Sequence, residues 1–145
     1  MKLKNIILNG LISFIPVAVI MALWILIRAQ PLVEKSVGMA PGFLVPRTTG
    51  EAIRTGYIIW LPISLVLGVF LALVYYWMAV KWHWKPYVFS IIVIGIAAVI
   101  SAGAFASGMT FAAEATGEML IIAIGYGVLI PVLSGRKQKE IQVKL

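Results

Sequence analysis

The chain has 145 residues, of which 62% are hydrophobic and 12% are charged, and its formal net charge is +7. Soluble globular domains contain about 45–50% apolar and about 25% charged residues. A chain this short has too little interior for so much apolar surface, whereas a bilayer accepts apolar side chains all round a helix. The composition excludes a soluble domain and predicts an all-α membrane protein, with one membrane domain over residues 1–145.

The first predicted transmembrane helix covers residues 5–27, after Lys2 and Lys4 and before Arg28. At 1.5 Å per residue this run is long enough to cross a hydrocarbon core of about 30 Å. No small-residue cleavage motif follows Arg28, so we interpret the run as a retained helix rather than a signal peptide. Pro16 lies inside it and predicts a bend.

An outer loop is predicted over residues 28–56, because Pro31, Pro41 and Pro46 occur there among several glycines. A second transmembrane helix is predicted over residues 57–80. Its two ends carry aromatic residues, which is the pattern of the two headgroup belts. Pro62 predicts a bend in this helix as well.

A short basic inner turn, residues 81–86, precedes a third predicted transmembrane helix over residues 87–106. Pro86 suits the first turn of that helix. The fourth predicted helix covers residues 110–133 and contains Pro131. Because only three residues separate the third and fourth helices, they must form an antiparallel hairpin. Residues 134–145 form a basic tail.

The basic residues predict the orientation of the chain in the membrane. Most of them fall on one predicted face, namely Lys2, Lys4, Lys81, Lys85, Arg136, Lys137, Lys139 and Lys144. The other face has Arg28, Lys35, Arg47 and Arg54, offset by four glutamates. Because cytoplasmic loops carry the excess of Lys and Arg, we expect two antiparallel hairpins with both termini cytoplasmic, in a cell (inner or plasma) membrane.

Small residues predict where the helices pack. Apolar side chains gain little by leaving lipid for each other, so membrane helices associate where small residues let their backbones approach. The third and fourth predicted helices are rich in such residues, which makes the second hairpin the expected tight core. The predicted packing residues are Gly95, Ala98, Ala102, Ala106, Ala113, Gly117 and Gly125.

One cluster of charges is a candidate functional site. Glu114 and Glu118 lie four residues apart and so share a helix face near the outer boundary, where Arg28 and Arg54 are possible partners. One interpretation is a cation or proton site open to the outside, with Glu118 as its deeper group. The other, which we favour, is a structural ion pair helped by the positive N-terminal end of the helix.

Several classes of chemistry are not expected. The chain has no cysteine or aspartate, and His83 is its only histidine. Zinc sites, Ser-His-Asp relays and paired-histidine haem ligation need residues that are missing, so we predict no enzyme activity and no catalytic, cofactor or metal site. A lone histidine in the basic turn is typical of a solvated interfacial residue. The basic residues lie at the ends of apolar runs, which argues against nucleic acid as a partner.

The basic tail has two open interpretations. Arg136, Lys137 and Lys139 could bind anionic lipid headgroups or a cytoplasmic partner, or they could serve only to fix the topology. Membrane lipids are expected partners in either case.

Part of the sequence resembles a known membrane family. The pattern starts with Gly10, Leu11 and Pro16, continues to Leu23 and Trp24, and extends to Pro41, Gly42, Gly56 and Gly68. It resembles the uncharacterised family that includes the plant continuous-vascular-ring-like proteins. The resemblance covers the first half of the chain and implies a related first hairpin. That family has no settled biochemical role, so the resemblance implies no activity and no site.

The functional prediction is a non-enzymatic membrane subunit that assembles with copies of itself or with other membrane subunits. A chain without a soluble domain, with few buried polar groups and many small residues, is typical of a packing partner. The alternative is a small oligomeric transporter or channel for cations or protons that uses Glu114 and Glu118.

Overall fold

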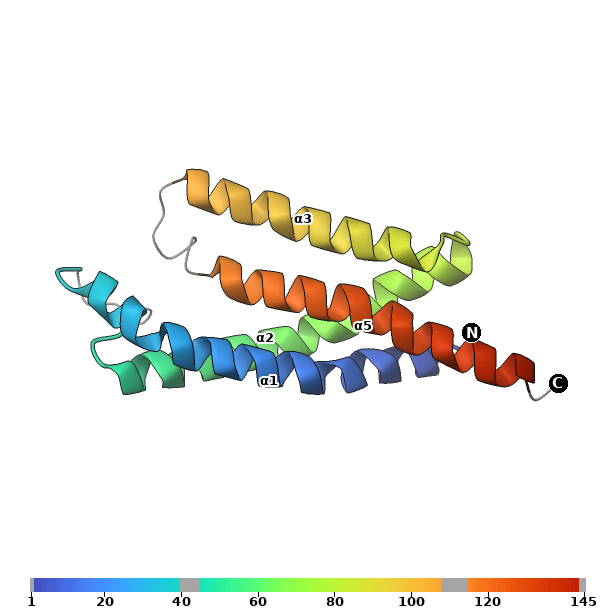
Figure 1. Cartoon of the computed structure of the whole chain (residues 1–145), viewed down its shortest axis with the longest axis horizontal. Coiled ribbons are helices and arrows are strands. Elements are labelled where there is room, and N and C mark those ends of the chain that lie inside the picture. The colour runs from blue at the N-terminus through green and yellow to red at the C-terminus, as the bar shows by residue number, and fades with distance from the viewer. Residues whose placement is uncertain (1, 40–44, 108–114, 144–145) are drawn as a thin grey trace.

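The computed structural model describes residues 2–39, 45–107 and 115–143. All regular structure in this part of the chain is helical, which confirms the predicted all-α class. The helices are α1 Leu3–Ser36, α2 Thr49–Tyr76, the π-helical turn η1 Trp77–Lys81, α3 Pro86–Ala106 and α5 Thr116–Val143 (Figure 1). Four stretches are long and apolar enough to cross a membrane, as predicted: Leu3–Ser36, Thr49–Lys81, Pro86–Ala106 and Thr116–Gly135.

The predicted outer loop is shorter than expected, because α1 continues to Ser36 and α2 already begins at Thr49. Pro31 lies inside α1 although it removes one backbone hydrogen bond. The helix is held on both sides of Pro31, since Ala29 and Ser36 are buried. The Ser36 hydroxyl also donates to the backbone oxygen of Pro46 at 2.6 Å. Tertiary contacts therefore outweigh the local effect of the proline.

A capping arrangement explains the early start of α2. The Thr48 hydroxyl accepts a hydrogen bond from the Glu51 backbone N–H at 3.2 Å, and the Glu51 carboxylate accepts one from the Arg47 N–H at 2.8 Å. This resembles a capping box, in which a threonine and a glutamate three residues later satisfy free N–H groups at a helix start. The helix therefore starts eight residues before the predicted second span.

The start of the third helix agrees with the prediction, whereas the fourth helix ends later than predicted. The third helix begins at Pro86, which occupies the first turn as expected. The fourth helix is described from Thr116, so the predicted start at residue 110 lies outside the described residues. Helix α5 then continues to Val143, through most of the predicted tail.

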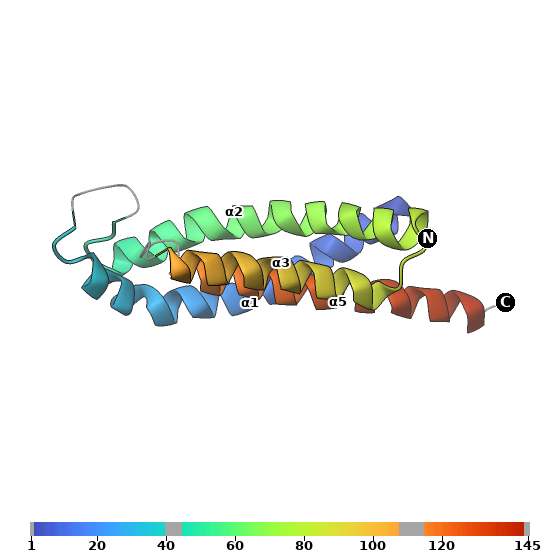
Figure 2. The same cartoon turned by 90° about the horizontal axis from the view of Figure 1, so that it is seen from above.

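The helices α1, α2 and α5 form a three-helix bundle, and α3 packs mainly on α5 (Figures 1 and 2). The apolar core lies among α1, α2, α5 and η1, and Phe89 of α3 extends it. Tyr75 and Phe89 meet edge to face, with ring centroids 5.1 Å apart. The two chain ends lie at the same end of the molecule as the turn between α2 and α3 (Figure 1).

Small residues bring α1, α2 and α5 close together. A Cβ atom added to Gly10 would lie 2.8 Å from the Ala72 Cβ and 2.9 Å from the Gly68 backbone oxygen. On Gly68 itself, an added Cβ would lie 2.6 Å from the Tyr126 ring. The backbones of α1 and α2 can therefore approach because position 10 is glycine, whereas glycine at position 68 makes room for the Tyr126 ring of α5.

The prediction that the small residues of the third helix pack inside the second hairpin is wrong. Gly95, Ala98, Ala102 and Ala106 are exposed, and a Cβ on Gly95 would have no neighbour within 4 Å. Instead α3 buries Phe89, Ala97 and Ser101. The orientation of α3 is set by Phe89 and by Ser90, whose hydroxyl donates to the Gly127 backbone oxygen at 2.6 Å. These contacts turn the small residues outward.

The other predicted packing residues lie elsewhere. Gly117 and Gly125 contact α1, where a Cβ would lie 2.6 Å from the Trp24 ring and 2.5 Å from Val17, respectively. Ala113 lies outside the described residues.

Replacing Gly10 by alanine should destabilise the bundle by about 1–3 kcal/mol, because the added methyl group meets backbone and cannot be accommodated without separating α1 from α2. Gly103→Ala is the matched control, since a Cβ at Gly103 meets nothing within 4 Å. It should be neutral or stabilising by about 0.5–1 kcal/mol, because alanine favours helix. Unfolding in detergent micelles measures both variants, and equal effects would contradict the close contact at Gly10.

Candidate functional site

The candidate site is an ion pair between the C-terminal part of α1 and the N-terminal end of α5. Glu118 lies in the first turn of α5 and is 0% exposed. Its carboxylate oxygen Oε1 contacts Nε of Arg28 on α1, whose side chain is 12% exposed. The structure therefore brings together two of the four charged residues that the sequence singled out.

Local packing explains why the two side chains meet. Trp24 and Arg28 lie four residues apart on α1 and so share one face of that helix. Gly117 leaves room for the Trp24 ring against the first turn of α5. This contact places Arg28, one turn further along α1, beside the carboxylate of Glu118. The N-terminal end of α5 adds a partial positive charge that also favours a carboxylate there.

The carboxylate depends on Arg28 for its charge balance. Among the described residues, neither oxygen of Glu118 has a hydrogen-bond partner of good geometry. A buried carboxylate is unfavourable unless it is paired or neutralised, and removing one member of a buried pair exposes the full desolvation penalty of the other. The ion pair with Arg28 is thus the main interaction available to Glu118 in the described structure.

The remaining predicted charged residues are not brought to this site. Arg54 is exposed on α2, and no ion pair joins it to another described residue. Glu114 lies outside the described residues. Arg136, Lys137 and Lys139 lie on the C-terminal part of α5, and their predicted contact with lipid headgroups stays a prediction.

Two further buried polar contacts join α5 to the other helices, and the sequence analysis missed both. Midway along the bundle, the hydroxyls of Ser64 and Tyr126 lie 3.3 Å apart. Near the opposite end, the Asn9 side-chain amide donates to the Ser134 hydroxyl at 3.0 Å. The Ser13 hydroxyl donates to the Asn9 backbone oxygen at 2.7 Å. All five residues are buried.

These contacts fall at regular intervals along α5. Glu118, Tyr126 and Ser134 are spaced by eight residues, which corresponds to about 12 Å per interval. Ile122 and Ile130 fill the positions between them and are also buried. We call Glu118, Tyr126 and Ser134 with their partners the three polar rungs. A polar residue every eight positions in a hydrophobic span is a sequence signal that could have revealed these contacts.

The polar rungs are suited to positioning helices rather than to chemistry. The isoleucines separate them, so the side chains do not form one continuous hydrogen-bonded chain. The described residues contain no group of three histidine, cysteine, aspartate or glutamate side chains that could hold a metal ion. In an apolar environment, a displaced polar group has no water to bind, so each rung favours one register of α5 against α1 and α2.

Comparison with protein-family models, curated proteins and solved structures found no match to this chain. The resemblance of the first half to the family with the continuous-vascular-ring-like proteins therefore stays a prediction.

Substitutions in the ion pair should have unequal effects on stability. Arg28→Gln leaves the Glu118 carboxylate buried without a counter-charge and should cost about 3–5 kcal/mol. Glu118→Gln should cost less, because the partly exposed guanidinium can reach water at the membrane boundary. The double variant should recover part of the loss caused by Arg28→Gln.

Arg54→Gln is the control, since Arg54 is exposed, and it should change stability by no more than about 0.5 kcal/mol. Denaturant unfolding in micelles provides the measurement. An effect of Arg28→Gln no larger than that of Arg54→Gln would show that the ion pair does not hold α1 to α5.

Proposed function

We propose that the protein is a non-enzymatic, multi-pass membrane subunit that assembles with copies of itself or within a larger membrane complex. The observation that carries this proposal is the outward face of α3. There the exposed small residues Gly95, Ala98, Ala102 and Ala106 lie beside Val99, which is 73% exposed. Exposed small residues in a membrane helix favour close contact with another helix.

The packing inside the chain supports this use of the α3 face. Where α1 packs on α2, Gly10 faces Gly68 and Ala72. The outward face of α3 has the same composition but has open space above Gly95 and Gly103. A helix of a second copy or of another subunit would therefore find on α3 the kind of surface that already joins α1 to α2.

The surroundings of Glu118 favour a structural role over transport. A cation or proton site must exchange its ligand with water, whereas the Glu118 side chain is buried and contacts Arg28. It also belongs to the regularly spaced rungs that align α5 with its neighbours. We therefore infer that the carboxylate holds the bundle together at its outer end.

The charge distribution supports an orientation with both termini in the cytoplasm and two antiparallel hairpins in a cell membrane. Lys2, Lys4, Lys81 and Lys85 belong to the end of the molecule that holds the termini and the α2–α3 turn (Figure 1). Arg28 and Arg54 lie towards the opposite end. Because Lys and Arg are enriched on the cytoplasmic side, the first end is the cytoplasmic one.

Cysteine labelling can test this orientation directly, because the chain has no natural cysteine. In intact cells, Thr49→Cys, at the start of α2, should react with a membrane-impermeant thiol reagent. His83→Cys, in the α2–α3 turn, should react only after the membrane is permeabilised. The reverse pattern would overturn the proposed orientation.

Assembly can be tested on the α3 face. In mild detergent the wild-type chain should run as an oligomer or co-purify with a partner. Ala102→Leu should shift it to smaller species, because the added side chain prevents close approach of the backbones. Val66→Leu on α2 is the control, since Val66 is exposed on another helix and already branched, and it should leave assembly unchanged.

Size-exclusion chromatography with light scattering gives the mass of each species. A wild-type chain that is monomeric and free of partners, both in detergent and after cross-linking in its native membrane, would contradict the proposed function.

A further inference from the structure

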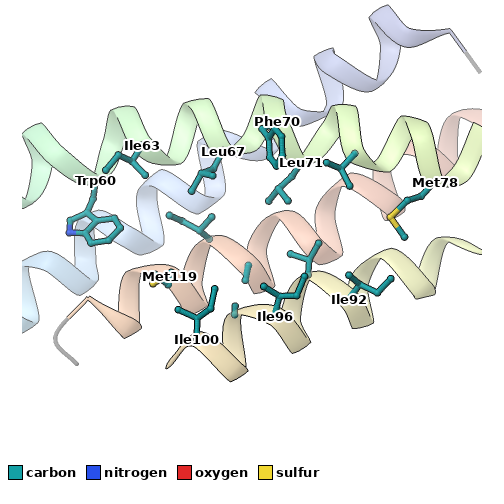
Figure 3. A pocket seen from close by; sticks show the side chains of 15 residues that line it. Trp60, Ile63, Leu67, Phe70, Leu71, Met78, Ile92, Ile96, Ile100 and Met119 are labelled. Carbon is teal, nitrogen blue, oxygen red and sulfur yellow. The ribbon is translucent and has the colours of Figure 1, made fainter. Parts of the chain in front are cut away.

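An apolar groove lies between α2 and α3. Its volume is about 410 Å³, which is within the range of small-molecule binding sites. Side chains of α2 and α3 face one another across it, and α5 forms its floor (Figure 3). The residues that the argument uses are Ile63, Leu67, Met78, Ile92, Ile96 and Met119.

The groove is accessible from the surroundings of the helices. Phe70 on one rim and Ile96 on the other are each more than half exposed. Both belong to stretches long and apolar enough to lie within a bilayer. The medium that reaches this groove in a membrane is therefore lipid hydrocarbon. On α3 the lining extends from Ile92 to Ile100, about 12 Å, close to the depth of about 15 Å of one leaflet.

Positive charge lies at one end of the groove. Met78, which lines that end, is three residues before Lys81. Lys85 precedes α3, about 10 Å from the level of Ile92. The Trp84 backbone N–H donates to the Met78 backbone oxygen at 2.9 Å, which ties the basic turn to this end of the groove. Both lysines are exposed.

Nothing in the neighbouring sequence neutralises these lysines. No aspartate or glutamate occurs between Glu51, in the first turn of α2, and Glu114, so residues 52–113, which include both lysines, have no acidic residue. The exposed aromatic residues Trp82, Trp84 and Tyr87 lie close to the lysines in sequence, and Lys81 Nζ lies 4.0 Å above the centre of the Trp77 ring. Aromatic and basic residues together are typical of the headgroup level of a membrane.

The size of the groove favours a lipid chain over a protein helix. One turn of a helix about 10 Å wide, with a pitch of 5.4 Å, occupies about 420 Å³. The groove thus holds roughly a single helical turn, far less than a membrane-spanning segment. An acyl chain is thin, flexible and wholly apolar, as the lining is.

We propose that this groove and the basic turn form a binding site for one anionic phospholipid. One acyl chain lies in the groove between α2 and α3, and the phosphate lies between Lys81 and Lys85. Basic pockets between transmembrane helices bind anionic lipid headgroups in this way. The site is separate from the outward α3 face, so it does not rest on the proposed assembly.

Native mass spectrometry of the detergent-purified chain tests the site, with phosphatidylglycerol and phosphatidylcholine of identical acyl chains as probes. The wild-type chain should retain one phosphatidylglycerol several times more strongly than phosphatidylcholine. The double variant Lys81→Gln and Lys85→Gln should lower this retention on the order of tenfold. The matched double variant Lys2→Gln and Lys4→Gln removes the same charge from the same end of the molecule and should have little effect.

Filling the groove with a larger side chain tests whether an acyl chain binds there. Ile96→Trp should reduce retention of both lipids, whereas Val99→Trp, on the same helix but outside the groove, should not. Leu67→Trp fills the groove from α2 and gives a second measurement if Ile96→Trp folds poorly. Circular dichroism confirms folding of each variant.

Three results would overturn the proposal: equal retention of the two lipids by the wild-type chain, equal effects of the two lysine pairs, or unchanged retention in both folded groove-filling variants. Ala102→Leu distinguishes this proposal from that of assembly, because it should alter the oligomer and leave lipid retention unchanged.

Discussion

The close contact of α1 with α2 is the constraint on which the rest of the bundle depends. Inside a bilayer, apolar side chains find lipid as favourable as one another, so helices need close van der Waals contact to associate. Gly10 provides it, because it leaves no Cβ between its own backbone and the Gly68 backbone oxygen. Tyr126 of α5 then lies on Gly68, and α3 is held through α5. Each later helix is therefore placed by the contact made before it.

Close packing alone does not define how far one helix is displaced along another. Small residues repeat along these helices, so several registers would offer similar contact. The polar rungs remove this ambiguity, because a shift of one turn would separate Glu118 from Arg28 and place its carboxylate at the level of Trp24 or Leu32. A polar group without a partner is unfavourable in hydrocarbon. Van der Waals contact makes the helices associate, and the buried polar pairs determine the position of one helix along another.

The sequence predicted the helical class, the four apolar spans and Arg28 as one of two candidate partners of Glu118, because these depend on composition, charge and spacing alone. It misplaced the tight packing. Small residues on α3 looked like a core, yet which face a helix turns inward depends on distant partners such as Gly127, which accepts from Ser90. Gly56, Ser64, Gly68 and Ala72 were the better signal, since these small residues follow one another at intervals of four or eight along α2 and all are buried. Thr48 and Glu51 could also have predicted the early start of α2.

The dependence of α3 on α5 has a consequence for biogenesis. As the chain leaves the ribosome in order, α1 and α2 can pair at once, whereas α3 must enter the membrane before its main partner has been synthesised. A helix waiting alone in lipid has to be stable there without neighbours. Residues 87–106 contain no charged side chain, so α3 meets this requirement. Helix α5, which carries Glu118, is inserted last, when Arg28 is already in place to receive it.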